Sequence, residues 1–211
     1  MRLGLIADVH ADPRALEDAL RGLDSHGVDL ILCAGDLVGY GAEPDAAVAL
    51  LRDRGIPCVR GNHDRWALER RQVLGPRGWK PAVLRDDTWA FLESLPASDR
   101  HVWAGRVLAV HHGSPASDTE YVTPYRPFPA SVERFLAASD VHVLILGHTH
   151  IPMIARGPCG TVVNPGSVLR VPSIPTSYSF AVVDSETLAV QLFDIRTGRE
   201  IRRDPAFLAD E

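Results

Sequence analysis

Short apolar runs that end abruptly in polar residues recur along the chain. Their length, β-branched content and glycine or polar boundaries are typical of buried strands. Five such runs span residues 3–7, 30–34, 57–59, 107–110 and 141–146. Further strands are predicted at 151–155, 161–164, 178–183 and 188–193.

Helical patterns separate these strands. Pro13 stands in the first turn of a predicted helix whose apolar residues recur three and four positions apart, and Asp12 is its expected N-cap. Pro44 opens a second helix, and residues 130–138 form another. The order strand, helix, strand, helix, strand predicts a parallel βαβαβ unit in the first part of the chain.

The segment 65–96 has a helical and aromatic pattern. Its break at Gly75-Pro76-Arg77-Gly78 predicts two helices rather than one. We expect its tryptophans, Trp66, Trp79 and Trp89, to pack between helices rather than to bind a ligand.

The second half is richer in strands, and this order fits either one mixed sheet flanked by helices or two facing sheets with helices outside. With 211 residues the chain can bury one good core, so we expect a single domain over residues 1–211. The polar segment 204–211 is expected to be a flexible tail.

Composition excludes several classes of function. The net charge of -5 and the isoelectric point near 6.0 argue against stable nucleic-acid binding through a basic surface. No apolar stretch approaches the roughly 20 residues that span a bilayer, and Asp8 interrupts the first apolar run too early for a signal peptide. The three cysteines lack CxxC spacing and fit reduced thiols, so we expect a cytoplasmic protein with no membrane partner.

Each of the first five strands is followed by a residue that can bind metal. In open sheets with helices on their faces, ligands gather at the carboxyl ends of the strands. Any one of these residues could be a helix cap, a turn residue or a half-buried histidine. Together at one edge they predict a metal centre, and their mixed oxygen and imidazole donors suit Mn, Fe or Zn. The set is Asp8, His10, Asp36, Asn62, His112, His148 and His150.

Seven ligands are too many for one tetrahedral ion and suit two ions that share a carboxylate. Two-metal hydrolases hold their ions about 3.5–4 Å apart. Asp36, alone at its strand tip, is the expected bridge. Of the pair His111-His112, the ligand is assigned to His112, which directly precedes Gly113, and His111 is expected on the opposite side of the strand.

These motifs resemble, in order and spacing, those of the calcineurin-like metallophosphoesterase superfamily. The resemblance extends from residue 3 to about residue 193. Gly35-Asp36-Leu37-Val38-Gly39-Tyr40-Gly41 and Asn164-Pro165-Gly166-Ser167 look like the small stand-alone bacterial and archaeal phosphodiesterase branch. The implied fold is an α/β, four-layer αββα sandwich of two mixed β-sheets flanked by helices. The motifs are Asp8-Val9-His10, Gly35-Asp36, Gly61-Asn62-His63-Asp64, His112-Gly113 and Gly147-His148-Thr149-His150.

The resemblance also implies a division of the ligands between two divalent metal ions. Asp8, His10 and His150 would hold the first ion. Asn62, His112 and His148 would hold the second, and Asp36 would bridge them. Mn is the expected metal, with Fe, Zn, Ni or Mg as alternatives. Where the family commonly has Gly-Asn, this chain has Ala11-Asp12, and we interpret Asp12 as the helix cap.

The implied activity is hydrolysis of a small phosphodiester or nucleotide by in-line attack of a metal-bridging hydroxide. His63, beside the metals without being a ligand, would protonate the leaving oxygen, and Asp64 would orient it. A phosphomonoesterase or a nucleotide-pyrophosphate hydrolase are alternatives. A non-enzymatic scaffold is disfavoured because His63 is present, whereas the retromer subunit that resembles this family lacks that histidine.

Substrate contacts are expected from residues in loops at the site edge of the sheet. The candidates are Tyr40, Tyr121, Arg126 and Arg170. Family members often pair, so a homo-oligomer is an open expectation.

Overall fold

The computed structural model describes residues 1–75, 78–125, 127–169, 178–201 and 206–207. Its smaller main sheet has four strands in the order β11-β10-β1-β2, with β1 parallel to β2 and antiparallel to β10. These strands are β1 (Arg2–Ile6), β2 (Leu30–Cys33), β10 (Ser179–Asp184) and β11 (Val190–Asp194).

The larger sheet is also mixed and has the order β12-β8-β9-β7-β6-β5. Strands β6, β7 and β9 run parallel, so β6 and β7 end at the same edge. The six strands are β5 (Ser98–Trp103), β6 (Arg106–His111), β7 (Val143–Ile145), β8 (Met153–Gly157), β9 (Gly160–Asn164) and β12 (Ala206–Phe207).

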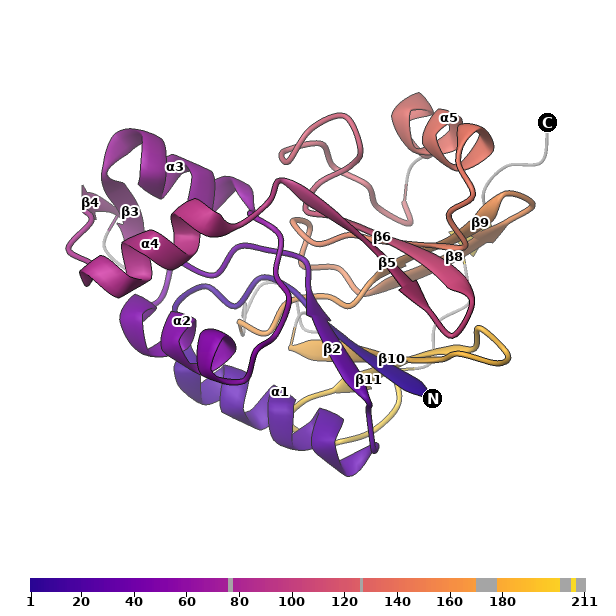
Figure 1. The fold of residues 1–211 in the computed structure, drawn as a ribbon, viewed down its shortest axis with the longest axis horizontal. Helices are drawn as coiled ribbons and strands as arrows, with labels where there is room; N and C mark the ends of the chain where they lie inside the picture. The colour runs from indigo at the N-terminus through magenta and orange to yellow at the C-terminus, as the bar shows by residue number, and fades with distance from the viewer. Residues whose placement is uncertain (76–77, 126, 170–177, 202–205, 208–211) are drawn as a thin grey trace.

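The two sheets face each other with helices outside (Figure 1). Leu5 of β1 and Val110 of β6 belong to one apolar cluster between the sheets. A second cluster joins helices α1 (Pro13–Ser25) and α2 (Pro44–Asp53) to the other face of the smaller sheet, and a third joins α5 (Ala130–Ala138) to the larger sheet. This arrangement confirms the predicted four-layer αββα sandwich.

One end of the molecule differs from the prediction for residues 65–96. Helices α3 (Asn62–Arg70) and α4 (Asp86–Ser94) are present, but a hairpin of β3 (Gln72–Gly75) and β4 (Gly78–Pro81) lies between them (Figure 1). The prediction of two helices rather than one is confirmed, and the glycine-rich break lies within the unpredicted hairpin between them. Trp79 lies on β4 with 45% of its surface exposed, and its ring contacts Trp66 and Arg70 of α3, so it packs against one helix and not between two.

Other local predictions have definite outcomes. Asp12 caps α1, because its Oδ1 accepts a hydrogen bond from the Ala15 backbone N–H at 3.0 Å. Residues 57–59 form only an isolated parallel bridge, between Cys58 and Cys33 of β2, and the polar strand β5 was not predicted. Within the expected tail, Ala206–Phe207 pairs with β8, and the rest of residues 204–211 lies outside the described residues.

Two further observations concern the helices and the cysteines. Among the described residues, no helix combines the length and the apolar character that crossing a membrane requires. The three cysteines are free thiols, with Cys33 and Cys58 buried and Cys159 exposed.

Candidate metal centre

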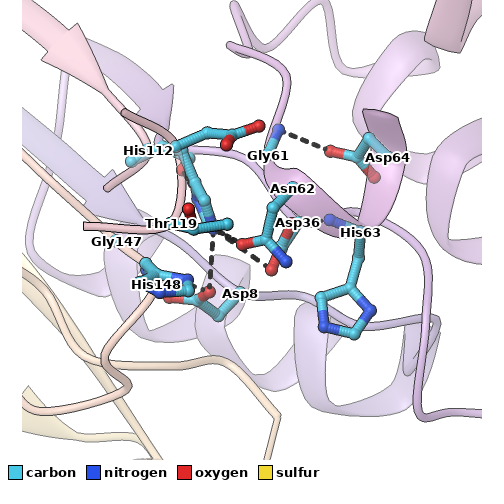
Figure 2. A network of polar contacts seen from close by, with 12 residues as sticks. Asp8, Asp36, Gly61, Asn62, His63, Asp64, His112, Thr119, Gly147 and His148 are labelled. Atoms are coloured by element: carbon cyan, nitrogen blue, oxygen red, sulfur yellow. Dashed lines mark hydrogen bonds and ion pairs between the residues drawn. The ribbon is translucent and has the colours of Figure 1, made fainter. Parts of the chain in front are cut away.

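All seven predicted ligands lie in one cluster at the strand ends of both sheets. Asp8 and His10 follow β1, Asp36 follows β2, and Asn62 begins α3. From the larger sheet, His112 follows β6, while His148 and His150 follow β7. Figure 2 shows Asp8, Asp36, Asn62, His112 and His148 converging from these separate elements.

The backbone of five of these residues lies in the left-handed region of conformational space. Their φ angles are 55° for Asp8, 50° for His10, 56° for Asp36, 67° for His148 and 58° for His150. A non-glycine residue pays of the order of 1–3 kcal/mol for such a conformation, which persists only where the surroundings fix it. Neighbouring loops do so here, since the backbone N–H groups of Asp8 and His10 donate to the carbonyls of Gly35 and Asp36, both at 2.9 Å.

The first group of potential ligands consists of Asp8, His10 and His150. Their ligand atoms all lie within 4.8 Å of one another. The Nε2 atoms of His10 and His150 are 2.9 Å apart, and His150 Nε2 is 3.4 Å from Asp8 Oδ1. Three donors that converge this closely can hold one ion.

The second group consists of Asp36, His112 and His148, again with ligand atoms within 4.8 Å of one another. His112 Nε2 is 3.1 Å from Asp36 Oδ2 and 3.1 Å from Asn62 Oδ1, which places the amide beside this group. Asp36 Oδ2 is also 3.8 Å from His10 Nε2, so this carboxylate lies between the two groups. That position suits the bridging role predicted for Asp36.

Backbone carbonyls orient two of the imidazoles. His10 Nδ1 lies 3.2 Å from the Val38 carbonyl oxygen, and His112 Nδ1 lies 2.6 Å from that of Ala34. A proton on Nδ1 makes each hydrogen bond and leaves the lone pair of Nε2 directed at the cluster. Metal-binding histidines are commonly fixed by such a partner.

The electrostatics of the cluster suit cations. Asp8 and Asp36 are buried, and among the described residues no Arg or Lys forms an ion pair with either. Asp8 Oδ2 and His148 Nε2 are buried without a hydrogen-bond partner. A buried carboxylate needs a compensating charge, and a buried polar atom needs a partner. Divalent cations would supply both the compensating charge and the missing partners. The mixed oxygen and nitrogen donors fit Mn, Fe or Zn.

The pKa of His112 shows the same excess of negative charge. Burial by itself lowers the pKa of His112, but the carboxylates of Asp36 and Asp8 outweigh burial and raise it to about 10. Burial lowers the pKa of His10 to about 3, although the same carboxylates oppose this. Metal ligation requires neutral imidazoles, so cations would replace the proton that the carboxylates otherwise hold on His112.

His63 lies beside the cluster without belonging to either ligand group. Its ring centroid is 5.1 Å from that of His10, and its backbone N–H donates to Asp36 Oδ1 at 2.8 Å. Gly39 lies against its ring, because a Cβ at that position would be 2.6 Å from His63 Nδ1. These contacts hold the imidazole next to the metal groups.

Asp64 does not make the contact predicted for it. Its Oδ1 accepts the backbone N–H groups of Leu37 and Val38 at 2.9 and 3.0 Å, and its Oδ2 accepts that of Gly61 at 2.9 Å. Figure 2 shows this carboxylate directed at Gly61, while the His63 ring points the other way. Asp64 therefore ties the loop after β2 to the start of α3 instead of orienting the imidazole.

Two of the four candidate substrate contacts adjoin the cluster. The Tyr40 ring lies 4.7 Å from that of His10 and 4.8 Å from that of His63, between centroids, and Tyr121 lies 4.7 Å from His148. Both tyrosines are exposed. Arg126 and Arg170 lie outside the described residues.

Sequence reasoning assigned no role at the site to several residues that support it. Asn164 Nδ2 donates to the Gly147 carbonyl at 2.6 Å, and Ser167 Oγ donates to the Asp8 carbonyl at 2.9 Å. Both belong to the Asn-Pro-Gly-Ser motif, which was the available signal. Gly61 leaves no room for a side chain, since a Cβ there would be 2.1 Å from Asp36 Oδ1.

Comparison with known proteins agrees with this geometry. Residues 1–188 match the calcineurin-like phosphoesterase superfamily domain. The chain belongs to this superfamily. Among calcineurin-like phosphoesterases, a probable metallophosphoesterase of Methanothermobacter thermautotrophicus is 28% identical, with 96% of each chain covered. An uncharacterized protein of Methanocaldococcus jannaschii is 30% identical over 72% of this chain, and the match spans 63% of that relative's length.

A solved calcineurin-like structure has the same architecture. The metallophosphoesterase from Sphaerobacter thermophilus is 28% identical and superposes with a TM-score of 0.70, covering 91% of this chain and 86% of its own. The superfamily membership and the two ligand groups make metal binding and phosphoester chemistry the basis for any account of function.

Proposed function

We propose that the protein is a metal-dependent phosphodiesterase acting on small phosphodiesters. The observation that carries this proposal is the pair of ligand groups that share one buried cluster, with Asp36 between them and Asp8 Oδ2 and His148 Nε2 without partners. Such an arrangement has little structural use, because buried unpaired polar atoms destabilise a fold.

The ligand groups would hold one divalent ion each, and Asp36 would contact both. With both groups loaded, the site would supply a hydroxide near neutral pH and would neutralise the charge that builds on the phosphoryl oxygens. Asn62 would complete the second group through Oδ1, which already lies 3.1 Å from His112 Nε2. Mn is our first expectation, with Fe, Zn, Ni and Mg as alternatives, because cellular supply decides metal identity as much as the ligands do.

His63 would act as the general acid. The attacking hydroxide oxygen would form a new P–O bond on one side of phosphorus, while the bond to the leaving oxygen breaks on the opposite side. The imidazolium of His63 would give its proton to that leaving oxygen. Burial lowers the pKa of His63, although Asp36 raises it. A lower pKa makes the imidazolium a stronger acid toward a departing alkoxide, at the expense of a smaller protonated fraction.

Among the described residues, the rim of the cluster favours a diester over a monoester. Tyr40 and Tyr121 bring neutral phenol groups next to the histidines. A diester carries one negative charge where a monoester carries two, so we take these two neutral phenols as support for the diester. Phosphomonoesterase and nucleotide-pyrophosphate hydrolase activities are the alternatives that a substrate panel must separate.

Metal analysis of the purified protein, followed by a Mn-supplemented panel of phosphomonoesters, linear diesters and cyclic nucleotides, tests the proposal. We expect two divalent ions per chain and the highest kcat/KM on a diester. Absence of turnover on the whole panel with every divalent metal would overturn the proposal in favour of a non-enzymatic scaffold.

The His63→Ala variant separates acid catalysis from metal binding. We expect kcat to fall by about 10²–10⁴-fold on a diester with an alkoxide leaving group, with little loss on a p-nitrophenyl ester, whose leaving group needs no proton. Metal content should stay at the wild-type value. An equal loss of kcat on both esters would show that His63 does not transfer the proton to the leaving group.

A further inference from the structure

A group of aromatic side chains lies beside His63. We call Trp66 of α3, Trp79 of β4 and the Arg70 guanidinium the aromatic shelf. The Trp66 ring is 5.0 Å from the His63 ring, and the Trp79 ring is 6.5 Å from it, between centroids. Trp79 is nearly parallel to the imidazole, with an angle of 7° between the planes.

The members of the shelf hold one another in place. The two indoles meet edge to face with centroids 5.8 Å apart. The Arg70 guanidinium carbon lies 5.4 Å from the Trp66 centroid and 5.6 Å from that of Trp79, within the range of cation–π attraction. Trp79 is therefore positioned by neighbours on another element, although its own hairpin has only two strands.

Packing of the hairpin onto the core does not explain why a tryptophan stands at position 79. Val73 of β3 is buried and joins the apolar core, so it anchors the hairpin. All four residues of β4 are exposed, and Trp79 presents a large apolar ring to solvent next to the candidate catalytic acid. Large exposed aromatic residues beside a site are typical of binding surfaces rather than of cores.

The leaving group of the proposed reaction must lie at His63, because His63 would protonate its oxygen. We propose that the aromatic shelf is a stacking subsite for the base of a nucleoside leaving group, so that the preferred diesters are nucleotides. This inference rests on the proposed function. A flat π system stacks well on Trp and on an arginine plane, whereas an aliphatic alcohol gains little from either.

A pair of substrates that differ only in the base tests the subsite. These are the 5′-(methyl phosphate) diesters of adenosine and of ribose. The wild-type protein should show a KM about tenfold lower for the adenosine compound, since stacking on one aromatic side chain is worth about that much. Trp79→Ala should abolish the difference by raising only the adenosine KM, and Trp79→Phe should retain most of it.

Lys80→Ala is the matched control, because Lys80 is the next residue of β4 and lines a separate cavity with Glu43 and Asp45. It should retain the wild-type preference. Thermal unfolding of each variant checks that the fold persists. A wild-type KM that is equal for the two diesters, or a preference unchanged in Trp79→Ala, would overturn the subsite and leave the phosphodiesterase proposal intact.

Binding gives a readout independent of turnover. Titration with AMP and with ribose 5-phosphate, followed by tryptophan fluorescence, should show AMP bound about tenfold more tightly, and Trp79→Ala should remove this difference. If the wild-type protein hydrolyses neither diester yet keeps this binding preference, the proposed function fails while the subsite stands. Equal affinity for AMP and ribose 5-phosphate would overturn the subsite.

Discussion

At the scale of single residues, Gly39 determines where His63 can lie. Its φ of +98° and the 2.6 Å approach of His63 Nδ1 to a Cβ position leave no room for a methyl group. Gly39→Ala should push the imidazole from its place and lower kcat on alkoxide-leaving diesters by at least tenfold. Metal content should not change, because neither residue belongs to the two ligand groups.

Gly55→Ala is the control for backbone strain. Gly55 has a φ of +62° but nothing within 4 Å of a Cβ position. Alanine at the φ of Gly55 costs roughly 1–2 kcal/mol, alanine at the larger φ of Gly39 costs more, and only Gly39→Ala adds the clash with His63. If the two variants lose the same activity, strain rather than the position of His63 explains the loss.

Residue chemistry at strand ends allowed the ligand cluster to be predicted. Asp8 follows an apolar run directly, Asp36 and His112 each follow one after a single residue, and parallel strands bring such positions to one edge. The link from Asp64 to the loop after β2 could not be predicted, because only the tertiary fold brings the backbone amides of residues 37 and 38 near, whereas Gly61 is three residues before Asp64 in the same helix start. Adjacency to His63 in sequence was misleading, since successive residues of a helix point in different directions.

At the scale of elements, Asp64 joins the start of α3 to the loop after β2. Asp64→Asn replaces one accepting oxygen by an NH₂ group that faces backbone N–H groups. Leaving buried donors unsatisfied costs about 1–3 kcal/mol, and each kcal/mol lowers Tm by roughly 2–4 °C in a chain of this size. Thermal unfolding should show this loss.

Asp29→Asn is the comparison for Asp64→Asn. Asp29 is exposed, and its Oδ2 accepts the backbone N–H of Arg2. Water can replace that bond, so we expect little change in Tm. A decrease in Tm as large as that of Asp64→Asn would contradict the explanation that the buried hydrogen bonds of Asp64 stabilise the fold.

Elements with an apolar face were predicted and those without one were not. Helix α5 has the predicted bounds, and β6, β9 and β10 lie within a residue of theirs. The edge strand β5, with sequence Ser-Asp-Arg-His-Val-Trp, has only Trp103 buried and so shows no apolar run. The hairpin of β3 and β4 has only short strands around glycines, which in sequence resemble a break between helices.

At the scale of the whole molecule, each ligand group takes residues from both sheets. Asp8 and His10 come from the smaller sheet and His150 from the larger, while Asp36 joins His112 and His148 across the same interface. An ion in either group would therefore link the two sheets. Binding to the folded state alone stabilises it by about 2.7 kcal/mol at a concentration of 100 Kd.

Mn²⁺ should consequently raise Tm by several degrees over the value in EDTA, as measured by calorimetry. His150→Ala should weaken this response, because it removes a donor of the first group. His101→Ala, on edge strand β5 away from both groups, should respond to Mn²⁺ like the wild-type protein. An equal Mn²⁺ response in His150→Ala would place the stabilising ion elsewhere.

The contribution of both sheets to each ligand group also constrains the order of events during synthesis. Ribosomes make Asp8, His10 and Asp36 early, whereas His148 and His150 follow more than one hundred residues later. Neither group is complete until β7 and the loop after it have left the exit tunnel. We therefore expect the nascent chain to load metal only after β7 and the loop that follows it have been made.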